Sequence, residues 1–211
     1  MQTYYAARAP EYDRVYLKPE RQTDLRAMEQ WVRSRFAGAS VLEIACGTGY
    51  WTQFIAEVAT HVLATDLTPE TVSIAKDRVT KPHVEFQIGD AYAPAQYSGR
   101  FDAAFAGFWF SHVPIARRAE FLSTLNAALD AGAKVVMLDN RYVEGSSSAI
   151  ADEDADGNTY QLRTLSDGTA HRVLKNFPSQ AQLLSLARRA GKGARVVEWQ
   201  YYWALEYVTG D

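Results

Sequence analysis

The stretch VLEIACGTG, residues 41–49, decides the fold class of this chain. Residues 41–45 are apolar except for Glu43, which is typical of a buried strand, and Gly47 and Gly49 follow at once. Glycines at such a position adopt positive φ angles and let a ligand approach the main chain closely. We therefore interpret 41–45 as a strand that ends in a ligand-binding turn, with a helix starting after Gly49.

Apolar runs alternate with segments of helical period on the carboxyl-terminal side of this turn. Thr68 is expected to cap the second of the helical segments, and Pro69 suits its first turn. The alternation predicts a parallel sheet covered by helices, which is the α/β class. Strands are predicted over 61–65, 83–88, 101–108 and 134–138, and helices over 50–59, 69–79 and 114–129.

The two ends of the chain follow other patterns. Residues 4–31 have a helical pattern and are rich in tyrosine. Short alternating stretches on either side of Asp167-Gly168 predict a β-hairpin, formed by 159–165 and 169–174. The remaining elements expected are a helix over 178–190, ended by Gly191, and one or two strands over 195–207.

The composition is that of a folded domain, with 47% hydrophobic and 22% charged residues among 211. A formal net charge of −3 provides no field that would attract nucleic acid or anionic lipid. The longest apolar run, 103–110, is too short to cross a bilayer, and residues 1–10 lack a signal-peptide pattern. One cysteine and four dispersed histidines predict no bound metal. We expect a cytoplasmic protein, monomeric or homodimeric, without nucleic-acid or membrane partners.

Three acidic residues are expected to meet at the carboxyl edge of the sheet. Glu43 lies on the strand before the turn, Asp66 ends the second strand, and Asp90 ends the third. In these positions Asp66 suits the hydroxyls of a ribose, Asp90 suits an adenine amine, and Glu43 suits a positively charged ligand group. A dinucleotide fingerprint would require a third glycine where Thr52 stands, so a pyrophosphate ligand is disfavoured.

The motif VLEIACGTG, with Asp66 and the Gly89-Asp90-Ala91 triplet at these distances, resembles the class I S-adenosylmethionine-dependent methyltransferases. Within them it is most similar to the small-molecule branch that includes the quinone-biosynthesis methyltransferases. The resemblance covers residues 12–138 in motif order and implies S-adenosylmethionine as cofactor, with S-adenosylhomocysteine as its product. It also implies methyl transfer to O, N, S or C of a small metabolite. Such a transfer is an in-line displacement, for which a protein mainly aligns the acceptor and excludes water.

We accordingly predict a single Rossmann-like, doubly wound, mostly parallel seven-stranded sheet, with an N-terminal helical lid and a β-hairpin insertion after the fifth strand. The whole chain, 1–211, is expected to be one methyltransferase domain. Its expected parts are the lid (1–38), the cofactor-binding core (39–140), the insertion with the hairpin (141–178), and the C-terminal helix and strands (179–211).

The resemblance further implies which residues bind the cofactor. The glycine turn would pass beneath the methionine part, Phe108 would lie beside the transferring methyl group, and Tyr12 and Tyr16 would close over the cofactor. Ordinary core packing is the alternative explanation for these three aromatic residues. The complete expected set is Tyr12, Tyr16, Glu43, Ala45, Cys46, Gly47, Gly49, Asp66, Leu67, Asp90, Ala91 and Phe108.

His112 is the candidate catalytic residue, because the ordinary pKa of imidazole suits a general base near neutral pH. A histidine that only packs at the start of a helix is the alternative. Arg141 suggests an anionic group on the substrate, unless it pairs with Asp139 or with the acidic run 152–154, which is expected to be a solvated loop. The expected substrate contacts are Tyr5, Trp109, His112, Asn140, Arg141 and Tyr142.

The sequence alone leaves two other kinds of function open. A methyltransferase-like scaffold or accessory protein would bind the cofactor without turnover, and a nucleotide-dependent oxidoreductase would bind NAD. A nucleic-acid methyltransferase is disfavoured, because no Asn-Pro-Pro-Tyr-like motif follows 101–108 and no basic stripe is present in the sequence.

Overall fold

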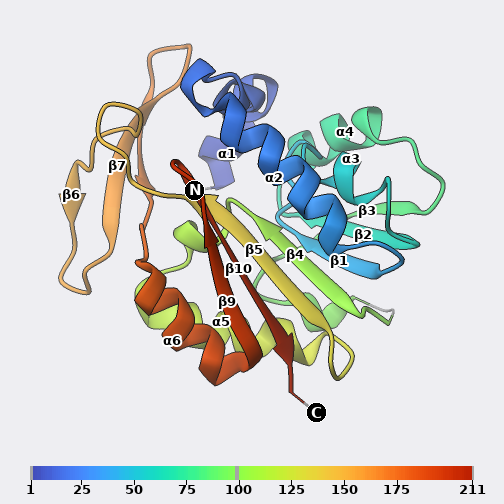
Figure 1. Ribbon diagram of the computed structural model, residues 1–211. Helices are drawn as coiled ribbons and strands as arrows, with labels where there is room; N and C mark the ends of the chain where they lie inside the picture. Colours follow the sequence, from blue (N-terminus) through green and yellow to red (C-terminus); the bar gives the residue numbers. More distant parts are fainter. Residues whose placement is uncertain (1, 98–99, 211) are drawn as a thin grey trace.

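The computed structural model describes residues 2–97 and 100–210 and is built around one seven-stranded sheet with the order β3-β2-β1-β4-β5-β10-β9 (Figure 1). Neighbours among β1 to β5 run parallel, whereas β10 runs antiparallel to both β5 and β9. The predicted fold class is therefore confirmed. The strands are β1 (Ser40–Ile44), β2 (His61–Asp66), β3 (Val84–Ile88), β4 (Ala103–Gly107), β5 (Lys134–Asn140), β9 (Gly191–Glu198) and β10 (Tyr202–Thr209).

Helices cover both faces of this sheet. On one face Val41 of β1 belongs to a core cluster with Leu25 and Val32 of α2, while on the other Leu42 and Ile44 belong to a cluster with side chains of α5 and α6. Both faces of β1 are thus buried, as its apolar sequence requires. The α-helices are α1 (Gln2–Arg8), α2 (Gln22–Arg35), α3 (Thr52–Ile55), α4 (Pro69–Arg78), α5 (Arg118–Ala127) and α6 (Gln180–Ala190), and the 3-10 helices are η1 (Ala9–Tyr16), η2 (Pro19–Arg21), η3 (Pro94–Gln96), η4 (Phe110–His112) and η5 (Ile115–Arg117).

Several helical predictions were too long. The helix expected over 50–59 is only α3, and the helix expected over 114–129 is split into η5 and α5. The helical stretch over 4–31 is broken into four pieces, with Pro10 in the first turn of η1 and Pro19 at the start of η2. Proline supplies no backbone N–H, so each of these positions suits the start of a new helix better than the interior of a long one.

The predicted Thr68 cap of α4 was also wrong, whereas the predicted end of α6 at Gly191 was confirmed. Thr68 precedes α4, but its side chain makes no capping hydrogen bond; Asp66 Oδ1 accepts from the Thr68 amide N–H at 2.9 Å instead. Gly191 follows α6 with an extended backbone (φ −175°) and begins β9 directly. A Cβ on Gly191 would lie 2.1 Å from the Val208 carbonyl oxygen, so glycine is needed there for close strand contact.

The insertion after β5 contains the predicted hairpin, formed by β7 (Thr159–Thr164) and β8 (Ala170–Leu174). Gly168 in the turn has φ +86°. A third strand, β6 (Asp152–Glu153), pairs with β7, so the acidic run is not the solvated loop that was expected. Arg172 of β8 forms an ion pair with Asp152 at 2.6 Å, which compensates one of these charges.

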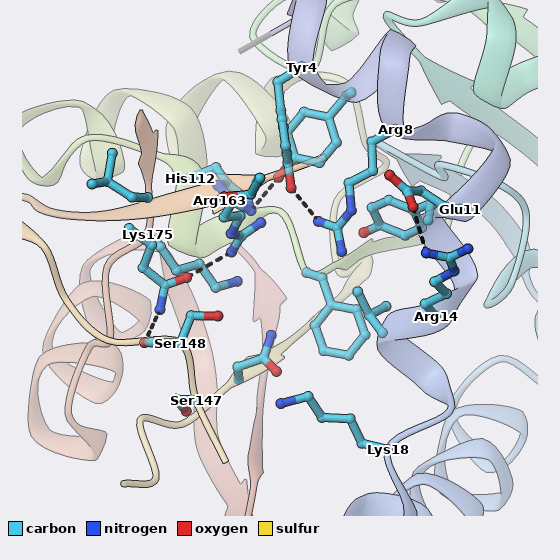
Figure 2. Close-up of a pocket in the computed structure, with 18 of the residues that line it drawn as sticks. Tyr4, Arg8, Glu11, Arg14, Lys18, His112, Ser147, Ser148, Arg163 and Lys175 are labelled. Atoms are coloured by element: carbon cyan, nitrogen blue, oxygen red, sulfur yellow. Dashed lines mark hydrogen bonds and ion pairs between the residues drawn. The ribbon is translucent and has the colours of Figure 1, made fainter. Parts of the chain in front are cut away.

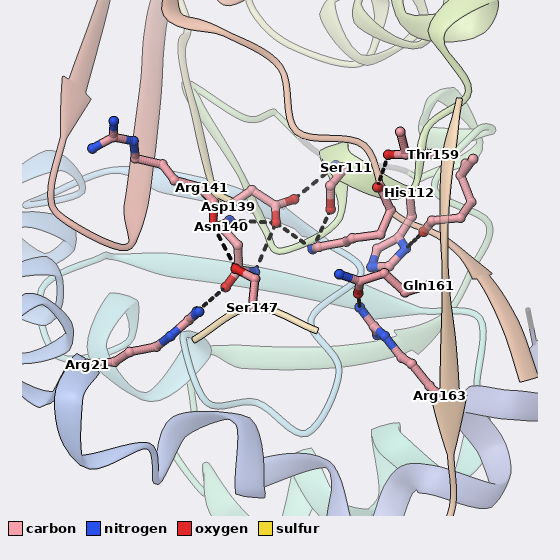
Figure 3. Close-up of polar contacts among 12 residues, drawn as sticks. Arg21, Ser111, His112, Asp139, Asn140, Arg141, Ser147, Thr159, Gln161 and Arg163 are labelled. Carbon is pink, nitrogen blue, oxygen red and sulfur yellow. Dashed lines mark hydrogen bonds and ion pairs between the residues drawn. The ribbon is translucent and has the colours of Figure 1, made fainter. Parts of the chain in front are cut away.

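A buried ion pair anchors this hairpin to the main sheet (Figure 3). Lys175, directly after β8, pairs with Asp139 of β5 at 2.7 Å, and its Nζ donates to Ser111 Oγ at 2.6 Å. Burial alone would raise the pKa of Asp139, but the Lys175 ammonium and the hydrogen bonds around it lower that pKa below its usual value. The carboxylate is therefore charged and paired in the folded state.

Removing the lysine should destabilise the fold strongly. Lys175→Met leaves Asp139 buried without a counter-charge, a change that typically costs ~3–5 kcal/mol. Urea unfolding of the variant should show this loss in the free energy of unfolding, whereas Arg172→Met, which breaks the exposed pair with Asp152, should cost less than about 1 kcal/mol. Equal losses in the two variants would contradict the role given to Lys175.

The same pair makes a prediction for pH. The pKa of Asp139 is lower in the folded than in the unfolded chain, so its contribution to stability is complete above the unfolded pKa of about 4 and disappears as pH falls through the folded pKa. Unfolding measured from pH 7 down to about pH 2 should show an acid loss of stability that is smaller in Asp139→Asn than in the unchanged protein.

Candidate functional site

Two adjoining cavities open at the carboxyl ends of the parallel strands. The smaller, which we call the second cavity, has a volume of about 130 Å³ and is lined by the ends of β1, β2, β3 and β4. The larger, the first cavity, has a volume of about 410 Å³ and lies between the N-terminal segment and the β7–β8 hairpin (Figure 2). Tyr5, Tyr12, Phe108 and His112 line both cavities.

Backbone geometry shapes the second cavity. Gly47 has φ +57° and Gly49 has φ +76°, and a Cβ on Gly49 would lie 3.0 Å from the Ala75 Cβ of α4. Ala45 (φ 53°) and Phe108 (φ 58°) are the described non-glycine residues with positive φ, and both line this cavity. Strained backbone of this kind tends to gather at functional sites, where the surrounding structure holds it in place.

The Asp66 carboxylate is held rigidly at the end of β2. Its Oδ2 accepts from the Gly47 amide N–H at 2.9 Å, while its Oδ1 accepts from the Thr68 amide N–H at 2.9 Å and from Thr71 Oγ1 at 3.1 Å. Asp90 Oδ1 likewise accepts from the Tyr92 amide N–H at 2.9 Å. The two carboxylates thus stand at one edge of the sheet in fixed orientations, with lone pairs left for a ligand.

The N-terminal segment is fastened over this edge by Asp13. Its carboxylate accepts from Thr48 Oγ1 at 2.6 Å, within the glycine turn, and forms an ion pair with Arg78 of α4. The neighbouring Tyr12 lines the second cavity, with its ring edge 3.9 Å from where a Gly47 Cβ would lie. A glycine at position 47 therefore leaves room between the turn and the segment above it.

The donor set of the second cavity fits S-adenosylmethionine. Two preoriented carboxylates suit ribose hydroxyls and an adenine amine, and the glycine turn leaves the main chain accessible. Phe108 and Ala91 supply apolar contact surface. Within residues 2–97 and 100–210 no group of three or more His, Cys, Asp and Glu side chains forms a metal site.

Glu43 differs from the sequence-based expectation. It is 1% exposed, lies beneath the turn and is not among the described residues that line the second cavity. Burial raises its pKa to about 8; the nearby Thr52 hydroxyl opposes this rise, and the Asp66 charge adds to it. Glu43 is therefore protonated near neutral pH in this structure and supplies little charge to a cationic ligand.

Most of the residues expected to bind the cofactor line the second cavity. They are Tyr12, Ala45, Gly47, Asp66, Leu67, Asp90, Ala91 and Phe108. Tyr16, Glu43, Cys46 and Gly49 do not; Tyr16 stacks on Tyr50 with ring centroids 3.6 Å apart. Cys46 is a free, buried thiol whose pKa burial raises well above its usual value, so the structure offers no redox role for it.

The residues expected to contact a substrate are divided by the structure. Tyr5, His112 and Asn140 line the first cavity, and Trp109 lines the second. Arg141 and Tyr142 line neither.

The side chain of Arg141 is used elsewhere. It donates to the Trp199 carbonyl oxygen at 2.7 Å and pairs with Glu198 at 3.5 Å, so the expected pairing with Asp139 or with the run 152–154 is wrong. Tyr142 packs edge-on against Phe177. The cations that do line the first cavity include Arg8, Lys18 and Arg163, which sequence reasoning missed because α1 and β7 meet only in the folded chain.

Comparison with known proteins agrees with this geometry. The family model described as "Methyltransferase domain" matches residues 41–132. The chain is 29% identical over 159 residues to a ubiquinone biosynthesis O-methyltransferase of Xanthomonas axonopodis pv. citri (strain 306), covering 74% of this chain. It spans 63% of the length of that relative. A magnesium-protoporphyrin O-methyltransferase of Rhodobacter capsulatus is 38% identical over 68 residues, which is 31% of this chain and 30% of the relative.

Solved structures cover more of the chain. A DhpI-SAH complex superposes with a TM-score of 0.81 and 29% identity over 99% of this chain and 95% of the other. A DhpI-SAM-HEP complex superposes with a TM-score of 0.79 and 28% identity, over 97% and 94%. The chain belongs to the class I S-adenosylmethionine-dependent methyltransferases. The cofactor of this family is S-adenosylmethionine, and these two related structures hold the cofactor or its product.

No helix in the described part of the chain is both long and apolar enough to cross a membrane.

The role of Asp66 can be tested directly. Asp66→Ala removes two acceptor oxygens at the end of β2, and we expect binding of S-adenosylhomocysteine to weaken about 100-fold or more, as expected for lost charge-assisted hydrogen bonds. Isothermal titration calorimetry measures this affinity. Glu70→Ala, on the exposed first turn of α4, should bind the ligand like the unchanged protein. Normal binding by Asp66→Ala would show that the cofactor lies elsewhere.

Proposed function

We propose that this protein transfers the methyl group of S-adenosylmethionine to a hydroxyl oxygen of a small molecule bound in the first cavity. The observation that carries the proposal is the common wall of the two cavities. Tyr5, Tyr12, Phe108 and His112 line both, so a ligand in one cavity would lie against a ligand in the other. Oxygen is favoured as the acceptor because the curated relatives above are named O-methyltransferases.

The cofactor, when bound, supplies a methyl carbon that is open to attack by a nucleophile. The protein's part is then to align the acceptor and to keep water out. The aromatic rings of Tyr5, Tyr12 and Phe108 suit both tasks, since they provide rigid apolar surface between the cavities.

The tautomer of His112 follows from its hydrogen bonds. Nδ1 lies 2.6 Å from the Leu174 carbonyl oxygen, which can only accept, so Nδ1 carries the proton (Figure 3). Nε2 is then an acceptor, and Tyr5 Oη lies 2.9 Å from it. Burial lowers the pKa of His112 well below its usual value, and the charges of Lys175 and Arg163 lower it further. A neutral imidazole at neutral pH can take up a proton.

This arrangement supports a short proton path. Burial raises the pKa of Tyr5 to about 12, so its phenol stays protonated and donates to His112 Nε2. A substrate hydroxyl that donates to Tyr5 Oη would pass its proton to that oxygen as Tyr5 passes its own to Nε2. The charge that develops on the substrate oxygen during attack is thereby limited, and no covalent intermediate with the protein is required.

In this proposal the N-terminal segment, α1 and η1, also covers the bound ligands. Tyr5 and Tyr12 come from α1 and η1, and Asp13 fastens this segment to Thr48 and Arg78. The lid assigned to 1–38 stays a prediction, and on this proposal it must open for the ligands to enter. The same holds for the division of the rest of the chain into core (39–140), insertion (141–178) and C-terminal part (179–211).

Turnover with hydroxyl-bearing small molecules, followed as formation of S-adenosylhomocysteine, tests the function. We expect His112→Ala to lower kcat by about 100-fold to 10,000-fold, the usual contribution of a general base, while the affinity for S-adenosylmethionine stays within about threefold. Tyr5→Phe should also lower kcat, because it removes the hydroxyl between the substrate and His112. Cofactor binding with no turnover of any acceptor would favour the accessory-protein alternative.

The pH profile gives a separate test. Because the active form of His112 is neutral and its pKa is lowered, kcat should stay level from pH 8 down to pH 6 and decline only in more acidic solution. A decline centred near pH 6.5, the ordinary pKa of histidine, would contradict the assignment.

A further inference from the structure

The first cavity has an excess of positive charge. Six cationic side chains line it, namely Arg8, Arg14, Lys18, Arg21, Arg163 and Lys175, against one carboxylate, Glu11. Glu11 pairs with Arg14 at 2.8 Å, and Asp139, beneath the cavity, pairs with Lys175 at 2.7 Å. Among the described residues the other four cations have no ion pair, although the chain as a whole has a net charge of −3.

Two of these four cations are aimed into the cavity by neutral partners. Arg8 donates to Tyr4 Oη at 2.8 Å, and its guanidinium carbon lies 5.2 Å from the ring centre of Tyr12. Arg163 donates to Gln161 Oε1 at 3.0 Å, and Gln161 is itself fixed by its bond to the Ser148 carbonyl oxygen at 2.7 Å. Figure 2 shows Arg8 and Arg163 approaching the cavity from opposite sides.

The other two cations are more fully used by the protein. Arg21 is 6% exposed and donates to Ser146 Oγ at 2.9 Å and to Asn140 Oδ1 at 2.8 Å. Lys18 donates to the Ser146 carbonyl oxygen. They add positive potential to the cavity, whereas Arg8 and Arg163 use few of the five N–H donors that a guanidinium offers.

Positive charges in a partly buried cavity repel one another and lose hydration. Without an anion, this arrangement therefore raises the free energy of the folded state. A protein carboxylate in an ion pair with these cations would reduce this unfavourable free energy, as Asp139 does for Lys175. Guanidinium groups bind oxyanions through two parallel N–H donors, which makes arginine well suited to carboxylate and phosphate groups. The missing counter-charge is therefore expected to come with the ligand.

Resting on the proposed function, we propose that the first cavity selects substrates that carry an oxyanion group, which Arg8 and Arg163 bind from opposite sides. The acceptor hydroxyl of the same molecule then faces Tyr5 and His112 at the common wall. Arg8 comes from α1 and Arg163 from β7, so a bound oxyanion also draws the N-terminal segment and the hairpin together over the reacting groups.

The test measures anion binding to protein saturated with S-adenosylhomocysteine. Isothermal titration calorimetry with inorganic phosphate, benzoate and the uncharged benzamide separates oxyanion recognition from general affinity for small molecules. We expect phosphate and benzoate to bind, benzamide to bind at least about tenfold more weakly than benzoate, and Arg8→Met and Arg163→Met each to weaken both anions about tenfold or more. The anion that binds with the higher affinity shows whether the site prefers a tetrahedral or a planar group.

Two matched variants serve as controls. Arg100→Met removes an exposed arginine that pairs with Asp130 away from the cavity, and it should bind both anions like the unchanged protein. Arg163→Lys keeps the charge but loses the planar fork, so it should retain more anion affinity than Arg163→Met. Each variant is first titrated with S-adenosylhomocysteine, which confirms that it is folded around an intact cofactor site.

The outcomes separate this inference from the proposed function. Equal binding of benzoate and benzamide, or unchanged anion affinity in both arginine variants, overturns the oxyanion site and leaves the methyltransferase proposal intact. If S-adenosylhomocysteine does not bind the unchanged protein, the proposed function fails, and the phosphate titration of the free protein and its arginine variants still decides the oxyanion site.

Discussion

The buried carboxylate of Asp139 holds together the parts of the chain that form the first cavity. It accepts from the Ser111 amide N–H at 2.9 Å and pairs with Lys175 at 2.7 Å. Ser111 precedes His112 in η4, and Lys175 follows Leu174, whose carbonyl oxygen lies 2.6 Å from His112 Nδ1. One carboxylate at the end of β5 therefore fixes both the backbone that carries the histidine and the backbone that sets its tautomer. A buried ion pair adds little net stability on average, but here it determines where the His112 imidazole lies.

The second cavity depends on backbone geometry more than on charge. Ala45 and Phe108 adopt positive φ at the ends of β1 and β4, and Gly47 donates to Asp66 across the ends of β1 and β2. Parallel strands bring these ends to one edge of the sheet, where the loops must turn sharply. The strained residues are held by packing on both faces of β1, so the stability of the core maintains the shape of the second cavity.

The two peripheral segments act together. Tyr4 of α1 packs with Leu165 and Val173 of the hairpin in a small apolar cluster, separate from the main core. This contact brings Arg8 and Arg163 to the same cavity, although the two residues are 155 positions apart in the sequence. Small peripheral clusters are more easily opened than a main core, which is compatible with the opening of these segments that the proposed function requires. Substrate specificity is thus expected to depend on the contact between α1 and the hairpin, which lies outside the seven-stranded sheet.

The sheet, the glycine turn and the two carboxylates at Asp66 and Asp90 can be predicted from the amino-acid sequence alone. These follow from local signals: short apolar runs predict strands, and parallel strands place their carboxyl ends at one edge. The sequence also indicates His112 as a candidate base, because few residue types titrate near neutral pH. The protonated state of Glu43 beneath the turn and the pairing of Arg141 with Glu198 depend on the folded chain. Burial and contacts between residues far apart in the sequence produce no repeating pattern from which they could be predicted. The same holds for the placement of Arg8 and Arg163 in the lining of one cavity, which depends on the packing of Tyr4 of α1 against the hairpin and not on any spacing in the chain.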